Sequence, residues 1–129
     1  MKIAAQALSG IVAAILLYLG ARHMFTPQAV QSITALTPDN AFGASNIRAM
    51  GAPLIMLGIV TAIGAIKSMY EFMVPVALYF LALIVARIVT LVADGSDPTV
   101  IRALILAIAF FAVTEFAVQV IKRHGKAAA

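Results

Sequence analysis

Long apolar runs separated by short polar stretches dominate the chain. Four of these runs could cross a membrane as helices, since a helix rises about 1.5 Å per residue and a hydrocarbon core is about 30 Å thick. The pattern predicts an all-α integral membrane protein, a four-helix bundle with one transmembrane domain over residues 1–129. The expected helices cover about residues 3–20, 49–66, 72–92 and 103–121.

The first apolar run has a second interpretation. Lys2 precedes it and the small pair Gly20-Ala21 ends it, as in a cleaved signal peptide. Leu19 suits such a cleavage site poorly. We therefore expect a retained helix.

One long connection, residues 21–48, follows the first run. Phe25-Thr26-Pro27 predicts a helix start, with Thr26 as the cap and the proline in the first turn. Asn46 is expected to cap the second span, which would place Pro53 near its start. Apolar residues at helical spacing predict a short amphipathic helix in this extracytoplasmic loop, with a plain ordered loop as the alternative: Val30, Ile33 and Leu36.

The other connections are short. Residues 67–71 predict a tight turn, and residues 93–102 predict a polar loop containing the turn signals Asp-Gly and Asp-Pro. Lys122-Arg123-His124 is expected to stop the fourth helix, leaving a disordered tail.

The composition supports a membrane environment. Hydrophobic residues make up 64% of the chain and charged residues 11%. A soluble domain of 129 residues could not bury so much apolar surface. The chain's net charge of +4 does not indicate nucleic acid, because the basic residues flank apolar runs. The expected partner is the lipid bilayer.

The distribution of basic residues predicts the orientation. Cytoplasmic loops carry an excess of lysine and arginine, which favours cytoplasmic N- and C-termini in a cell inner membrane. The end predicted to be cytoplasmic has Lys2, Lys67, Lys122, Arg123 and Lys126, and the other end has Arg22, Arg48 and Arg102.

Signals for enzymatic chemistry are absent from the sequence. There is no cysteine, and His23 and His124 are too far apart in the chain to suggest a metal site. There is also no glycine-rich phosphate loop and no Ser/His/Asp set. We therefore expect a non-enzyme without a cofactor or metal.

Pairs of small residues four apart occur in three spans and let neighbouring helices approach closely. Packing among the four helices suffices to explain them, and dimerisation is an alternative that they allow but do not require: Gly10 and Ala14, Gly58 and Ala62, and Ala82 and Ala86.

Arg87 is the clearest candidate for function, because it interrupts an apolar run. Asp94 lies two turns further on the same face, but helical side chains lean toward the N-terminus, away from Asp94. A partner from another helix is therefore expected. The predicted outer cluster either fastens the loops through ion pairs or binds an anionic headgroup or small acid. Its members are Asn46, Arg48, Arg87, Asp94 and Arg102, with Arg48 and Arg102 expected at helix N-termini.

Glu115 is the intramembrane acid. Helical rise places it about 13 Å from Arg87 along the membrane normal, so a direct salt bridge is not expected. It either specifies helix packing or carries a proton or cation. The polar residues predicted near its depth are Gln6, Ser9, Thr61, Tyr79 and Gln119.

Several short motifs, in this order and spacing, resemble the bacterial membrane family called domain of unknown function 4345. The resemblance covers about residues 3–120 and implies four helices, but no activity or substrate. Ser96-Asp97 lengthens the expected Asp-Gly-x-Pro turn. The motifs are Phe25-x-Pro27, Asn46-Ile47-Arg48-Ala49-Met50-Gly51 followed by Leu54 and Gly58, Ala86-Arg87-Ile88-Val89, and Asp94-Gly95 before Pro98.

These observations favour a small structural or accessory membrane protein that acts through helix contacts with itself, as a homo-oligomer, or with a larger membrane complex. The alternative is a small-molecule or lipid-binding protein, or a transporter working as an oligomer. That alternative would use the Arg48/Arg87 layer or Glu115.

Overall fold

Four long helices make up the computed structural model, which describes residues 1–30 and 39–128. No strand occurs in these two ranges, and each long helix is apolar enough to cross a membrane. The predicted all-α fold with four spanning helices is confirmed. The helices are α1 (Lys2–Phe25), α3 (Ala41–Lys67), α4 (Val74–Ala93) and α5 (Pro98–Ala128), with 3₁₀ turns η1 (Pro27–Val30) and η2 (Tyr70–Phe72).

Helix α3 begins earlier than predicted. Asn40 has an extended backbone, and its side-chain oxygen accepts a hydrogen bond of 2.8 Å from the Gly43 N–H. Asn40 is therefore the cap, and the capping role predicted for Asn46 is wrong. Arg48 and Pro53 consequently lie inside the helix rather than near its start.

Helix α5 is longer than predicted at both ends. The Asp97 carboxylate accepts a 2.6 Å hydrogen bond from the Thr99 N–H, so the helix begins at Pro98 and the polar loop shrinks to residues 94–97. Arg102 then lies in the second turn of α5. The predicted stop at Lys122-Arg123-His124 is also wrong, because α5 continues to Ala128. Basic side chains favour the C-terminal end of a helix dipole and do not end the helix.

The segment after α1 differs from the predicted cap. The Thr26 hydroxyl donates to the Arg22 carbonyl at 3.0 Å, so it closes α1 instead of capping the next helix. Pro27 does open the 3₁₀ turn η1. Most of the predicted amphipathic helix falls on residues 31–38, outside the described residues.

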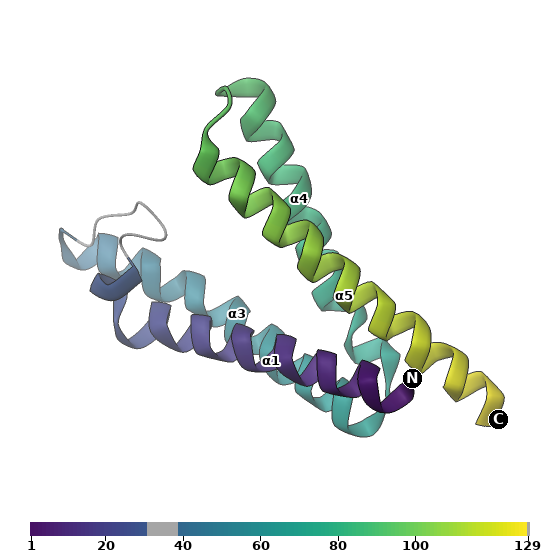
Figure 1. Ribbon diagram of the computed structural model, residues 1–129. Coiled ribbons are helices and arrows are strands. Elements are labelled where there is room, and N and C mark those ends of the chain that lie inside the picture. The colour runs from purple at the N-terminus through teal and green to yellow at the C-terminus, as the bar shows by residue number, and fades with distance from the viewer. Residues whose placement is uncertain (31–38, 129) are drawn as a thin grey trace.

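The helices form two hairpins, α1 with α3 and α4 with α5 (Figure 1). The first hairpin is the more closely packed, because glycines let the backbones approach. A Cβ atom on Gly51 would lie 2.5 Å from the Gly20 carbonyl oxygen, and one on Gly58 would lie 2.7 Å from Leu17 Cγ. At Gly51 a larger residue would require a shift of the neighbouring backbone, and at Gly58 it would require the Leu17 side chain to move.

The two hairpins meet at one end and diverge at the other (Figure 1). The closed end contains the start of α1, η2 and the C-terminal part of α5, and both chain termini lie there. The open end contains η1, the start of α3 and the α4–α5 turn. Between them, Phe80 of α4 stacks on Phe110 of α5 with ring centroids 5.2 Å apart. The core cluster around this pair also contains Val12, Leu16, Leu57 and Val76.

Candidate functional site

The residues of the predicted outer cluster are divided between the two hairpins at the open end. Asn46 and Arg48 lie on α3, whereas Arg87, Asp94 and Arg102 lie on α4, the turn and α5. These hairpins point apart in Figure 1, and all five side chains are exposed. Among the described residues no ion pair joins any of them, so the structure does not bring this set together.

Arg87 lies on the same face of α4 as the buried residues that precede it, but in a part of the helix where this face is exposed. Val76, Phe80 and Leu83 precede it at helical spacing; the first two are 0% and 5% exposed and Leu83 is half-buried. Arg87 itself is exposed, because the α1–α3 hairpin has diverged from α4 at this height (Figure 1). Helical side chains lean toward the N-terminus, so the Arg87 side chain is expected to lean toward Tyr79, two turns closer to the closed end.

The polar residues beyond Arg87 are engaged in local backbone bonds. The Thr90 hydroxyl donates to the Ala86 carbonyl at 3.1 Å, and the Asp94 N–H donates to the Thr90 carbonyl at 2.8 Å. Asp97 caps α5, and the hydrogen bonds from Thr99 hold the pKa of its carboxyl below the usual value. The Asp97 carboxylate therefore organises the start of α5, whereas Asp94 contributes its backbone N–H to the end of α4. The Asp-Pro pair in the sequence could have predicted the Asp97 cap.

Glu115 lies on α5, half-buried, and accepts a hydrogen bond of 2.7 Å from Gln119. The Phe80–Phe110 stack shows how far it is from Arg87. Arg87 lies seven residues beyond this stack toward the open end, and Glu115 lies five residues beyond it toward the closed end. The two charged residues are therefore about 18 Å apart along the helices. As expected, they do not form a salt bridge.

The remaining polar residues predicted near Glu115 do not bond to it. The Ser9 hydroxyl donates to the Ala5 carbonyl at 2.8 Å, and the Thr61 hydroxyl donates to the Leu57 carbonyl at 2.7 Å. Both bonds stay within one helix. The Ser9 hydroxyl also lies 3.8 Å from the Met73 sulfur, and Gln6 bonds to another helix, so the predicted inner layer does not gather around Glu115.

Gln6 has a structural role that the sequence did not reveal. Its side-chain N–H group donates to the Ala65 carbonyl at 2.8 Å and to the Ser68 hydroxyl at 2.9 Å. These bonds tie the first turns of α1 to the end of α3. Because the partners are about sixty positions away in the chain, no local pattern could have predicted them.

Two cation–π contacts were also missed. The Lys122 ammonium lies 5.5 Å from the ring centroid of Tyr70, and the Arg22 guanidinium lies 5.8 Å from that of Tyr18. The second pair is four residues apart on one helix, a spacing at which side chains meet. The spacing of Tyr18 and Arg22 could therefore have predicted this contact from the sequence.

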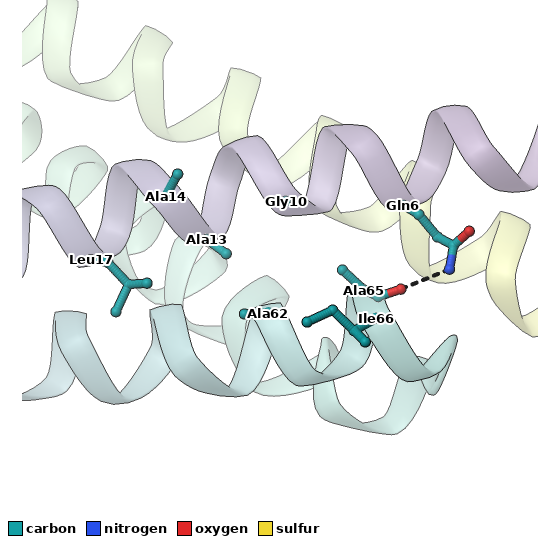
Figure 2. Close-up of a pocket in the computed structure, with 8 residues that line it drawn as sticks. All are labelled: Gln6, Gly10, Ala13, Ala14, Leu17, Ala62, Ala65 and Ile66. Atoms are coloured by element: carbon teal, nitrogen blue, oxygen red, sulfur yellow. Dashed lines mark hydrogen bonds between the residues drawn. The ribbon is translucent and has the colours of Figure 1, made fainter.

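An open groove of about 460 Å³ runs along the seam between α1 and α3 (Figure 2). Its walls are mostly small apolar side chains, and Gln6 lies at the end nearest the closed end of the molecule. The lining residues are Gln6, Gly10, Ala13, Ala14, Leu17, Ala62, Ala65 and Ile66.

Four long apolar helices with few charged groups between their ends define a multi-pass membrane protein. The model of the family described as Domain of unknown function (DUF4345) matches residues 4–118, and the chain belongs to this family. The family resemblance seen in the sequence motifs is thus confirmed. No match to the chain was found among curated proteins or among solved structures.

Proposed function

We propose that the protein is a non-catalytic accessory subunit of a larger membrane complex. Its contact site is the Arg87-bearing face of α4, which receives a spanning helix of another membrane protein that carries an acidic residue. One observation supports this most directly: Arg87 continues a core face of α4 but is exposed and has no ion pair within the described chain.

The position of Arg87 makes an external partner favourable. Arg87 lies six residues before the end of α4 at Ala93, about 9 Å along the helix axis. An arginine at the centre of a spanning helix costs about 2.5–3.5 kcal/mol on insertion scales and less toward the helix end, and an opposite charge offsets this cost. The Arg87 side chain is expected to lean toward the N-terminal end of α4, away from Asp94. This expectation supports a partner from another chain.

A second copy of this chain supplies no suitable acid. Two copies in the same orientation would present Glu115 about 18 Å from the depth of Arg87, by the same helical rise. The other acidic residues of the chain lie in or beside connections between the helices: Asp39, Glu71, Asp94 and Asp97. The geometry therefore supports a hetero-complex over a homo-oligomer.

The test is affinity purification from native membranes with wild-type protein, Arg87→Leu and Arg102→Leu. Arg102 is exposed at the same end and is the matched control. We expect a stoichiometric membrane protein with wild type and Arg102→Leu, and at least a ten-fold loss with Arg87→Leu. Arg87→Glu should also lose the partner, and replacing the partner's acid with arginine should restore it. Equal recovery with Arg87→Leu would refute the proposal.

We also propose an inner-membrane location with cytoplasmic termini. Both termini lie at the closed end, where Lys2 and Lys67 are exposed (Figure 1). Because the chain has no cysteine, single introduced cysteines report orientation directly. A membrane-impermeant maleimide should label Ser96→Cys from the periplasmic side and Glu71→Cys only after lysis. The reverse labelling would show the opposite orientation.

A further inference from the structure

Gly10 has no explanation in the packing of the described chain. A Cβ atom added to Gly51, Gly58 or Gly64 would lie within 2.7 Å of a neighbouring atom. A Cβ atom on Gly10 would meet nothing within 4 Å among the described residues. Glycine inside a helix is destabilising relative to alanine. The effect of this glycine is to deepen the groove between α1 and α3.

The groove is long and narrow rather than a flat patch of small residues. Figure 2 shows Leu17 near one end, Gln6 and Ile66 near the other, and Gly10 on the wall between them. From Gln6 to Leu17 the wall of α1 extends about 16 Å. Because both helices are long and apolar enough to cross a membrane, an open groove along their seam would face hydrocarbon. Its volume of about 460 Å³ falls within the range of ligand sites, about 300–1,000 Å³.

Positive charge lies at the end of the groove nearest the closed end. Lys2 is one helical turn before Gln6 on the same helix, and Lys67 directly follows Ile66. Both lysines are exposed, and long lysine side chains extend toward the headgroup level while their stems cover apolar surface. An occupant with an apolar chain and an anionic end therefore matches the groove.

We infer that the groove binds one acyl chain of an anionic glycerophospholipid, with its phosphate facing Lys2 and Lys67. This site is separate from the Arg87 face of the proposed function and does not depend on it. A second copy of the chain fits less well. Two copies in the same orientation, joined groove to groove, would bring their Lys2 and Lys67 residues together at one depth, and like charges repel.

Native mass spectrometry of the purified full chain in mild detergent tests the inference. The probes are phosphatidylglycerol and phosphatidylcholine with identical acyl chains. Wild type should retain one phosphatidylglycerol in preference to phosphatidylcholine. Gly10→Leu should weaken the binding of both at least ten-fold, because Gly10 lines the groove and a Cβ atom added there meets no other atom of the described residues within 4 Å, which leaves the leucine to occupy the groove. Ala112→Leu, an exposed position on α5, is the control and should bind as wild type does.

The charge contribution is measured separately. Lys2→Gln and Lys67→Gln should each weaken phosphatidylglycerol binding about five-fold and leave phosphatidylcholine unchanged. Arg123→Gln, exposed at the same end, should change neither.

Three outcomes would overturn the inference: unchanged lipid binding by Gly10→Leu, equal binding of the two lipids by wild type, or a protein dimer that Gly10→Leu dissociates. Circular dichroism verifies the fold of each variant. Ala14→Leu fills the same groove and decides the question where Gly10→Leu does not fold.

Discussion

The first prediction compares one substitution at two helical glycines, Gly51→Ala and Gly10→Ala. Alanine is the better helix former, and each replacement gains about 0.5–1 kcal/mol from this effect. The two positions differ only in what the new methyl group meets. At Gly51 it would lie 2.5 Å from the Gly20 carbonyl oxygen and 3.1 Å from His23 Cβ, whereas at Gly10 it meets open space within the described chain.

The cost at Gly51 follows from these distances. Ordinary van der Waals contact for a Cβ begins near 3.4 Å, so α1 and α3 must separate by about 0.9 Å at this point. Overpacking of this kind costs about 1–3 kcal/mol. Both variants gain the same helix propensity, so their free energies of unfolding should differ by the overpacking cost of about 1–3 kcal/mol. Gly51→Ala should be destabilised relative to wild type, and Gly10→Ala should be stabilised by up to about 1 kcal/mol.

Reversible unfolding in mixed micelles, followed by circular dichroism at increasing mole fraction of denaturing detergent, measures both variants. Gly58→Ala is a second clash variant, with a new methyl 2.7 Å from Leu17 Cγ. Leu17 is a side chain that can move, so this variant should lose less stability than Gly51→Ala. If Gly51→Ala were as stable as Gly10→Ala, the close contact of the α1 and α3 backbones would not exist in solution.

Three further predictions concern the polar and aromatic contacts. Gln6→Leu should destabilise the fold by about 0.6–1.7 kcal/mol in the same assay, since it removes hydrogen bonds between helices; Gln119→Leu, which breaks a bond within one helix, should cost less. A double-mutant cycle of Phe80→Leu and Phe110→Leu should give a coupling of about 0.5–1.5 kcal/mol, and additive losses would contradict the ring stack. Asp97 has a folded pKa below its unfolded value, so its contribution to stability is present above the unfolded pKa, near 3.8, and is lost as the pH falls through the folded pKa. Thermal unfolding of wild type should therefore lose more stability below about pH 4 than that of Asp97→Ala, and parallel pH profiles would refute the cap.

The spanning helices were predictable because long apolar runs have one favourable environment. Helix ends were less predictable, since apolar character stops where the hydrocarbon stops and a helix can continue into water. The first turns of α3, from Ala41 to Arg48, and the last turns of α5 are of this kind. Asn40 and Asn46 are equally good caps by residue type, and only the extended backbone at Asn40 distinguishes them.

The candidate site was predictable in its residues but not in its arrangement. Sequence position indicated that Arg87 lies inside a span and that Glu115 is too far away to pair with it. Whether Arg48 and Arg87 meet depends on how far the two hairpins diverge, and this depends on packing between residues that are distant in the sequence, as in the core cluster around Phe80. The groove was hidden for a similar reason, because Gly10 looked like an ordinary helix-packing glycine until the surrounding chain was in place.

The divergence of the two hairpins also affects the surrounding bilayer (Figure 1). A wedge-shaped protein occupies a larger cross-section in the leaflet at its open end than in the leaflet at its closed end. Because the helices are separated at the open end, more of their surface can contact lipid in that leaflet, and any change in the separation of the hairpins changes this contact area. The lateral pressure in the half of the bilayer that surrounds the open end thus acts directly on the distance between α3 and α4.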